Sequence, residues 1–268
     1  MQYKRVLTIA GSDSGGGAGI QADIKAISAN GCYAATAITA ITVQNTLGVS
    51  DVHPIPIHII EGQINAVLGD IGADAIKIGM LHSSEVIFAI KRCLQRYPVK
   101  NIVLDPVMVS TSGHRLIEVS AIETLKRELS GMARVITPNI PEAEILIGRK
   151  IEHQNQLPEV AKELSSNLNV SVLLKAGHLR ESILTDIFYN AETDELIRLN
   201  SKRIETANTH GTGCTLSSAL ASQLAKGLNL NRAVQTAKDY INGAIENGVN
   251  YKTGSGHGPV HHFFGFWK

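Results

Sequence analysis

The chain has 268 residues, of which 44% are hydrophobic and 18% charged. This apolar content is enough for a sizeable core, so a disordered chain is excluded. The 25 Lys and Arg residues nearly balance the 24 Asp and Glu residues, for a formal charge of +1, and aromatic residues make up only 4%. A general nucleic-acid binder would show a basic surplus or stacking aromatics, so we expect no nucleic-acid partner.

The three cysteines, Cys32, Cys93 and Cys214, are widely spaced and form no C-x-x-C pair. Neither a zinc ribbon nor a disulfide framework fits this spacing. No apolar run approaches the length of a membrane span, and the N-terminal apolar stretch is too short for a signal peptide. We therefore expect a soluble, cytoplasmic protein in a reducing compartment, with no membrane partner.

Short apolar runs alternate with helical patterns along most of the chain. Strands are predicted at 5–10, 33–43, 75–78, 102–104, 134–136 and 170–174, with a hairpin at 183–189 and 195–199. Helices are predicted at 18–30, 56–68, 85–95, 121–129, 141–147, 157–167, 215–227 and 230–248. This alternation indicates a mostly parallel sheet with helices on both faces. Since no linker or repeat divides the chain, we expect one α/β domain over residues 1–268.

The strongest local signal is Thr-His-Gly-Thr-Gly-Cys at 209–214, directly before a predicted helix. Gly211 and Gly213 let the backbone turn so that several N–H groups point one way, and the helix N-terminus adds partial positive charge. These features predict an anion hole suited to a phosphoryl group. The helix field is expected to lower the thiol pKa of Cys214. The alternative is a tight loop-to-helix cap with a buried cysteine.

A second glycine cluster, at 11–19, matches neither G-x-G-x-x-G nor G-x-x-x-x-G-K-[ST], so neither the dinucleotide-binding nor the P-loop mechanism is supported. After it, Asp23 shares a helical face with Ile20, Ile24 and Ile27. A carboxylate buried there needs a partner, and a substrate hydroxyl or ring nitrogen would serve. The alternative is a helix-start carboxylate that complements the helix dipole.

Ligands of open α/β sheets bind beyond the carboxyl ends of the strands, where Asp105, Asn139 and Lys175 follow three predicted strands. Asp105 and Glu142 are candidates to organise Mg²⁺ through bound waters and phosphate oxygens, because Mg²⁺ takes few direct protein ligands. Asn139 and Glu142 also fit a capping box with Pro141 in the first turn, and the two roles are compatible. Lys175 either neutralises nucleotide phosphates or extends to solvent.

Over nearly its whole length the chain resembles the bacterial hydroxymethylpyrimidine/phosphomethylpyrimidine kinases of thiamine biosynthesis, which are ribokinase-like proteins. The matching segments are Ile-Ala-Gly-Ser-Asp-Ser-Gly-Gly-Gly-Ala-Gly-Ile-Gln-Ala-Asp at 9–23, Thr-Val-Gln-Asn-Thr at 42–46, Ile-Gly-Met-Leu at 78–81, Leu-Asp-Pro-Val-Met at 104–108, Thr-Pro-Asn-Ile-Pro-Glu-Ala at 137–143, Thr-His-Gly-Thr-Gly-Cys at 209–214 and Gly-His-Gly-Pro-Val-His-His at 256–262. The resemblance implies a three-layer α/β/α sandwich with a mostly parallel central sheet.

The resemblance also implies two successive ATP-dependent phosphorylations. The hydroxymethyl group of 4-amino-5-hydroxymethyl-2-methylpyrimidine would be phosphorylated first, and the monophosphate would then become the diphosphate. ATP and Mg²⁺ are the implied cofactors, and a homodimer is the implied assembly. Two alternatives are a pyridoxal/pyridoxine kinase of the same superfamily and a non-catalytic vitamer-binding regulator. The second would need neither the Mg²⁺ residues nor Cys214.

The resemblance assigns roles to individual residues. Gln44 would read the aminopyrimidine edge with its amide, and Asp23, the backbone near Gly11, Met80 and Val107 would form the rest of the pyrimidine pocket. The other implied roles are a general base at Cys214, phosphoryl binding by Gly211, Thr212 and Gly213, ATP binding by Lys175, Thr209 and Asn139, and Mg²⁺ binding by Asp105 and Glu142.

Overall fold

The computed structural model describes residues 2–108, 116–177 and 182–267, and its nine described strands form one sheet in the order β3-β2-β1-β4-β5-β6-β7-β8-β9. The six central strands pair in parallel, whereas β3 at one edge and β8 and β9 at the other pair antiparallel. The strands are β1 (Arg5–Asp13), β2 (Tyr33–Asn45), β3 (Gly48–Pro54), β4 (Ala75–Ile78), β5 (Ile102–Leu104), β6 (Val135–Ile136), β7 (Ser171–Leu174), β8 (Ile183–Asn190) and β9 (Glu195–Lys202).

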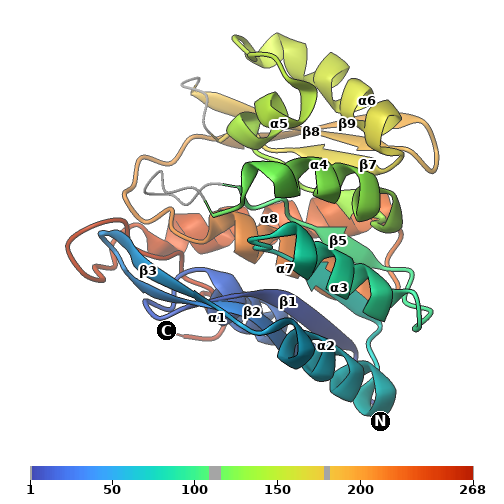
Figure 1. Cartoon of the computed structure of the whole chain (residues 1–268). Coiled ribbons are helices and arrows are strands. Elements are labelled where there is room, and N and C mark those ends of the chain that lie inside the picture. Colours follow the sequence, from blue (N-terminus) through green and yellow to red (C-terminus); the bar gives the residue numbers. More distant parts are fainter. Residues whose placement is uncertain (1, 109–115, 178–181, 268) are drawn as a thin grey trace.

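Helices cover both faces of this sheet (Figure 1). One face carries α2 (Ile57–Ala66), α3 (Ser84–Leu94), α4 (Val119–Glu128), α5 (Ile140–Ile147) and α6 (Leu157–Leu168), and the other carries α1 (Gly19–Ala29), α7 (Thr212–Ala225) and α8 (Leu230–Gly248). The predicted three-layer α/β/α sandwich with a mostly parallel sheet is therefore confirmed. Within the described residues, no helix is long and apolar enough to cross a membrane.

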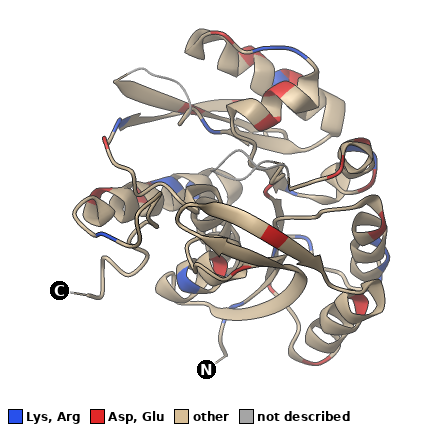
Figure 2. Cartoon of the chain, turned by 60° about the vertical axis from the view of Figure 1, so that its left-hand side comes forward, with Lys and Arg blue, Asp and Glu red and all other residues tan. Residues whose placement is uncertain are grey.

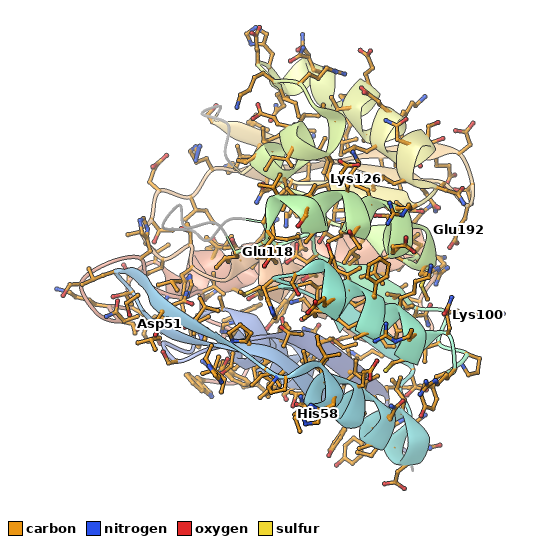
Figure 3. All side chains as sticks on the ribbon, viewed as in Figure 1. Asp51, His58, Lys100, Glu118, Lys126 and Glu192 are labelled. Carbon is orange, nitrogen blue, oxygen red and sulfur yellow. The ribbon has the colours of Figure 1, made fainter. Side chains whose placement is uncertain are left out.

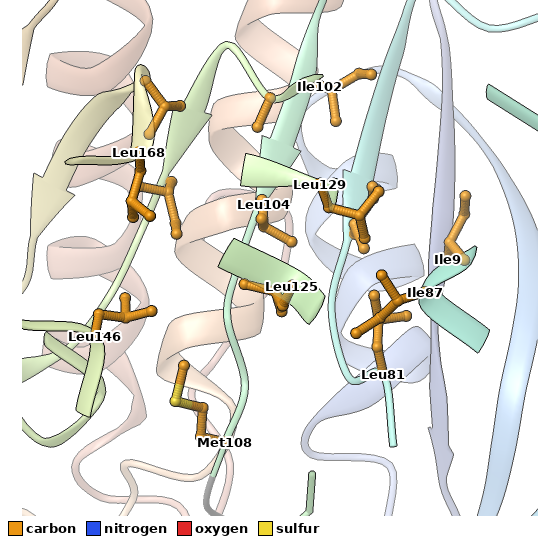
Figure 4. Close-up of a cluster of buried hydrophobic side chains, with 14 of the residues drawn as sticks. Ile9, Leu81, Ile87, Ile102, Leu104, Met108, Leu125, Leu129, Leu146 and Leu168 are labelled. Atoms are coloured by element: carbon orange, nitrogen blue, oxygen red, sulfur yellow. The ribbon is translucent and has the colours of Figure 1, made fainter. Parts of the chain in front are cut away.

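Two hydrophobic cores follow from the period of two along each strand. In β1, Leu7 and Ile9 face the layer of α2 to α6, and Val6, which precedes Leu7, faces α7 and α8. Figure 4 shows part of the first core, where Leu125 of α4 and Leu129, which caps the end of α4, lie near Leu104. Because the central strands are buried on both faces, most of their polar side chains lie at the strand ends, and the buried Thr8 of β1 and Lys77 of β4 are exceptions.

Two departures from the predicted elements bear on the site. Strand β3, which was not predicted, is an edge strand whose alternation is broken by exposed polar residues. It extends β2 beyond the body of the sheet (Figure 1). Helix α7 begins at Thr212 rather than at the predicted residue 215, because Gly211 takes a left-handed conformation (φ +77°) as its N-cap. Thr212, Gly213 and Cys214 therefore form its first turn.

Acidic and basic side chains are interspersed over the elements, without a single basic face in the orientation of Figure 2. The labelled charged residues Asp51, Lys126 and Glu192 lie on separate outer elements, on β3, α4 and the β8–β9 turn (Figure 3). This distribution matches the near-neutral composition of the chain.

Candidate active site

A cavity of about 540 Å³ lies at the carboxyl ends of the central strands, where ligands of open α/β sheets bind. It is lined by residues in the carboxyl-terminal parts of β1, β2 and β4, by residues that follow β4, β5, β6 and β7, and by the first turn of α7. All the predicted site residues except Asp23 line it, namely Gly11, Gln44, Met80, Asp105, Val107, Asn139, Glu142, Lys175, Thr209, Gly211, Thr212, Gly213 and Cys214. The structure thus gathers segments far apart in the sequence around one space.

The first turn of α7 has the geometry of an anion site. No side chain caps it, and its residues line the cavity, so the positive end of the helix dipole lies at the cavity wall. A Cβ atom on Gly211 would lie 1.8 Å from the carbonyl oxygen of Gly17, so only glycine fits. A Cβ atom on Gly213 would lie 3.3 Å from Lys175 Nζ, which places the lysine beside the same turn.

Lys175 and Asp105 form an ion pair at the floor of the cavity. Lys175 Nζ lies 3.0 Å from Asp105 Oδ1, and Thr137 Oγ1 donates to the same oxygen at 2.9 Å. Although burial alone raises it, Lys175 and then Lys77 hold the pKa of Asp105 below its ordinary value. Lys175 therefore lies in the cavity as a cation and does not extend to solvent.

Asn139 and Glu142 form the predicted capping box at the start of α5. The Asn139 side chain accepts from the Glu142 N–H at 3.0 Å, and the Glu142 carboxylate accepts from the Asn139 N–H at 2.8 Å. Burial raises the pKa of Glu142 to about 7, with nearby Asp105 acting in the same direction and Lys175 against it. A cation held in the cavity would favour the carboxylate form of Glu142.

The donor set around the cavity suits a weakly held Mg²⁺. Within residues 2–108, 116–177 and 182–267, no three His, Cys, Asp or Glu side chains gather closely enough to hold a metal by themselves. Asp105 and Glu142 instead line the cavity as separate carboxylates. Such a set fits an ion that keeps most of its waters and binds phosphate oxygens.

Asp23 does not face the cavity, and its predicted contact with substrate is wrong. Its side chain is fully buried and pairs with the buried Lys77 at 3.0 Å. It also accepts from Thr8 Oγ1 at 2.6 Å and Ser218 Oγ at 2.7 Å. The buried carboxylate has the partners that it needs inside the protein. Nor does it lie in the first turn of α1, which contains no acidic residue.

The expected lowering of the Cys214 thiol pKa is also wrong. Burial raises the pKa of Cys214 to about 11, with nearby Lys77 opposing the shift and Asp23 and Asp105 adding to it. Desolvation by the surrounding protein is the largest influence on this pKa, and Cys214 lines the cavity as a thiol at neutral pH.

Gln44, Met80, Val107 and Gly11 line the same cavity. A Cβ atom on Gly11 would lie 3.0 Å from Met80 Sδ, so the glycine lets the methionine approach the backbone closely. The side-chain amide of Gln44 contacts Thr42 Oγ1 at 3.0 Å and His210 Nε2 at 3.4 Å.

Sequence reasoning missed Asp13, Lys77 and His210, which also line the cavity. Asp13 and His210 are buried, and His210 Nε2 lies 2.8 Å from Asp13 Oδ2. Lys77 is the one polar residue of Ala75–Ile78, a strand buried throughout. A lysine inside such an apolar run indicates a buried carboxylate partner, and this signal was available in the sequence.

The sheet order, the two helical layers and the anion site at α7 define a ribokinase-like kinase. The phosphomethylpyrimidine kinase family model matches residues 13–261. The chain belongs to this family, as its sequence motifs predicted.

Individual relatives agree with this assignment. The chain is 48% identical over 265 residues to the hydroxymethylpyrimidine/phosphomethylpyrimidine kinase of Rhizobium meliloti, with 98% of each chain covered. The crystal structure of phosphomethylpyrimidine kinase from Clostridium difficile has a TM-score of 0.79 and 45% identity, covering 90% of this chain and 99% of that one. A pyridoxal kinase from Staphylococcus aureus, solved in complex with AMP-PCP and pyridoxal, has a TM-score of 0.90 and 32% identity, covering 99% and 96%.

Proposed function

We propose that this protein phosphorylates 4-amino-5-hydroxymethyl-2-methylpyrimidine with ATP, first to the monophosphate and then to the diphosphate, in thiamine biosynthesis. One observation carries the proposal: two kinds of binding surface line the same cavity. One is the side-chain amide of Gln44 beside an apolar wall, and the other is the N-terminus of α7 beside Lys175. Gln44, Met80 and Val107 suit the flat aminopyrimidine. The α7 turn and Lys175 suit the transferring phosphoryl group. The names of the 40–48% identical bacterial relatives support the same substrate.

Positioning and charge neutralisation account for most of the proposed catalysis, because phosphoryl transfer has a loose transition state. The turn of Gly211, Thr212 and Gly213 would hold the transferring phosphoryl group, and Lys175 would neutralise the ATP phosphates. Thr209 and Asn139 would contact the nucleotide. Bound Mg²⁺ would supply further neutralisation of the phosphates, and Asp105 and Glu142 would hold its water ligands.

The two steps place different demands on Cys214. A primary hydroxyl is a poor acid, so a base at Cys214 would assist the first transfer. The second acceptor is a phosphate, which is already anionic and needs no base. Because Cys214 rests as a thiol, its action as a base requires the minor thiolate form, which the nearby Lys77 favours.

The test is ADP release with Mg-ATP and three acceptors: the hydroxymethylpyrimidine, its monophosphate, and pyridoxal. Turnover of the first two with little use of pyridoxal supports the proposal. The close structural match to the S. aureus pyridoxal kinase makes pyridoxal the second candidate acceptor. Preference for pyridoxal, with no use of the monophosphate, would refute the thiamine-pathway assignment.

We also propose that the protein is a cytoplasmic homodimer built from single-domain protomers. The β2–β3 arm supports a second copy as partner, since Ile41, Val43 and Leu47 on it are 46%, 56% and 70% exposed. Three free cysteines suit a reducing compartment. Light scattering should give twice the 28.7 kDa mass of one chain, and the monomer mass at micromolar concentration would contradict the dimer.

A further inference from the structure

Asp186 of β8 and Lys238 of α8 form a buried ion pair that the proposed reaction does not use. Lys238 Nζ lies 2.7 Å from Asp186 Oδ2, and the two residues are 8% and 4% exposed. Both line the cavity. Withdrawing two charges from water is costly, and the cost is offset only where their remaining polar atoms also find partners. Asp186 meets this requirement with its second carboxylate oxygen, Oδ1.

This second oxygen binds the residue that follows Lys175. Asp186 Oδ1 accepts from the Ala176 N–H at 2.7 Å. The main-chain pairing of β7 with β8 ends at Leu174 and Ile187, and Asp186 is the next residue of β8. Its side chain therefore takes over where the main-chain ladder stops, at the wall of the cavity. Because Ala176 is fully buried, its N–H needs such an acceptor inside the protein.

Lys175 is thereby held through the main chain on both sides. Its own N–H donates to the Pro138 carbonyl at 2.9 Å, on the side of β6, and the next N–H along the chain goes to Asp186 of β8. Its Nζ lies 3.0 Å from Asp105 Oδ1 and beside the first turn of α7. The Pro138 contact uses a main-chain carbonyl that any residue offers. The contact with Asp186 depends on one side chain, and so on the residue type at that position.

We propose that Asp186 and Lys238 are positioning residues for Lys175, the lysine that would neutralise the ATP phosphates. Asp186 fixes the peptide that follows Lys175, and Lys238 fixes the Asp186 carboxylate. Without this anchor the end of β7 is free to shift, and Lys175 Nζ loses its fixed place between Asp105 and the α7 turn. The inference rests on the proposed function, which gives Lys175 its role, and deepens it. The effect of the pair on nucleotide binding therefore depends on Lys175.

Two matched double variants separate the anchor from the ion pair. The anchor-loss variant, Asp186→Leu with Lys238→Met, removes both charges and the acceptor for the Ala176 N–H. The anchor-keeping variant, Asp186→Asn with Lys238→Met, also removes both charges, but its amide oxygen can still accept from Ala176. Neither variant leaves an unpaired buried charge, so we expect both to fold, which circular dichroism checks.

Calorimetry with Mg-ADP measures the effect on nucleotide binding. We expect the anchor-loss variant to bind Mg-ADP about tenfold more weakly than the wild type, the effect of one weakened contact to a charged group. The anchor-keeping variant should stay within about threefold of the wild type. Lys175→Met alone should weaken binding by about tenfold or more. On the Lys175→Met background, the anchor-loss substitutions should change the affinity by less than about twofold, because no lysine is left to position.

Equal ADP affinity of the two double variants would overturn the inference, and so would an undiminished loss on the Lys175→Met background. If Lys175→Met binds Mg-ADP as tightly as the wild type, the role of Lys175 fails and the inference fails with it. No acceptor is present in these measurements. A preference for pyridoxal in the turnover assay would therefore refute the proposed acceptor and leave the inference standing, so the two failures are distinguishable.

Hydrogen exchange of the Ala176 N–H gives a second measurement that needs no variant. NMR on the ligand-free wild type should show slow exchange, as expected for a buried and hydrogen-bonded amide. Exchange as fast as in an exposed loop would overturn the anchor. In the anchor-loss variant we expect faster exchange at Ala176, and in the anchor-keeping variant a rate close to that of the wild type.

Discussion

Lys77 and Asp23 form an ion pair in which both side chains are wholly buried, with Nζ 3.0 Å from the carboxylate. Ser218 of α7 donates to the same carboxylate at 2.7 Å, so the pair joins β4, α1 and α7 beside the cavity. Although burial opposes it, Asp23 raises the pKa of Lys77 above its ordinary value, and Lys77 stays charged. This fixed cation acts on both Cys214 and Asp105.

Removing one partner of this pair should be costly. Asp23→Ala leaves Lys77 as an unpaired buried charge, so we expect the free energy of unfolding to fall by about 3–5 kcal/mol. Lys77→Met should have an effect of similar size. The double variant should lose much less than the sum of the two, because neither charge is then left alone. Urea denaturation of the four proteins measures this, and additive losses would contradict the pairing.

For Asp23, the sequence predicted the burial of the side chain but could not identify its partner. Its place on the apolar face of α1 correctly predicted a buried carboxylate with a partner. The partner lies 54 residues away on another element, so helical periodicity could not distinguish Lys77 from a substrate. The Asp13–His210 contact spans 197 residues and was equally hidden.

The fold and the position of the cavity were easier to predict from the sequence, because both follow from local patterns. The alternation of apolar runs and helical stretches predicted the layers, and one topological rule placed the strand ends together. The prediction for the pKa of Cys214 was wrong because desolvation, the largest influence on this thiol, cannot be seen in a sequence. Strand β3 was missed because its two apolar residues, Val49 and Val52, are three positions apart and give no period of two.

The thiol of Cys214 should react slowly at neutral pH. With a pKa of about 11, the thiolate population rises with pH through the whole accessible range. We expect the rate of alkylation by iodoacetamide to rise about tenfold per unit between pH 7 and 9 without levelling off. Cys214→Ser gives the background from the buried Cys32 and Cys93. A plateau below pH 8 would show that the helix field prevails after all.

Substitution of Cys214 should separate the two proposed phosphoryl transfers. Cys214→Ala should slow phosphorylation of the alcohol by about 10²–10⁴-fold, the usual contribution of a general base. Phosphorylation of the monophosphate should change much less, since that acceptor is already anionic. Single-turnover assays with each acceptor measure the two rates separately. Equal losses in both steps would exclude the base and leave a structural or anion-binding role.

Gly211 should be far less replaceable than a glycine of similar backbone conformation elsewhere. Gly211 and Gly227 both have positive φ, +77° and +89°. A Cβ atom on Gly227 would meet nothing within 4 Å, whereas on Gly211 it would collide with the Gly17 carbonyl. Gly227→Ala should cost about 1 kcal/mol in unfolding free energy, from backbone strain alone. Gly211→Ala should cost more and also weaken ADP binding, because the first turn of α7 must shift. Equal stability and equal ADP affinity of the two variants would contradict this close approach.

Glu142 should give the protein a stability that falls as pH rises through the weakly acidic range. Its pKa is raised from 4.5 to about 7 in the folded state, so between these values the folded protein holds a proton that the unfolded chain releases. The free energy of unfolding should therefore decrease over this window, by at most about 3 kcal/mol, and level off above pH 7. Glu142→Gln keeps an acceptor for the Asn139 N–H and removes the titration. Parallel denaturation of both proteins at pH 5 and 7.5 checks this, and identical slopes would contradict it.

The proposed Mg²⁺ role of the same carboxyl predicts that Mg²⁺ binding is accompanied by proton release. If Glu142 holds water ligands of the ion, binding of Mg-ADP at pH 6.5–7 should stabilise its charged form and expel the proton that it carries in the free protein. Calorimetry in two buffers of different ionisation enthalpy should detect a release of up to one proton by the wild type. Glu142→Gln should release markedly less, and ADP without Mg²⁺ should release little from either protein. The Glu142→Gln variant tests the carboxylate itself, since its capping contact remains. Equal proton release by both proteins with Mg-ADP would place the ion away from Glu142.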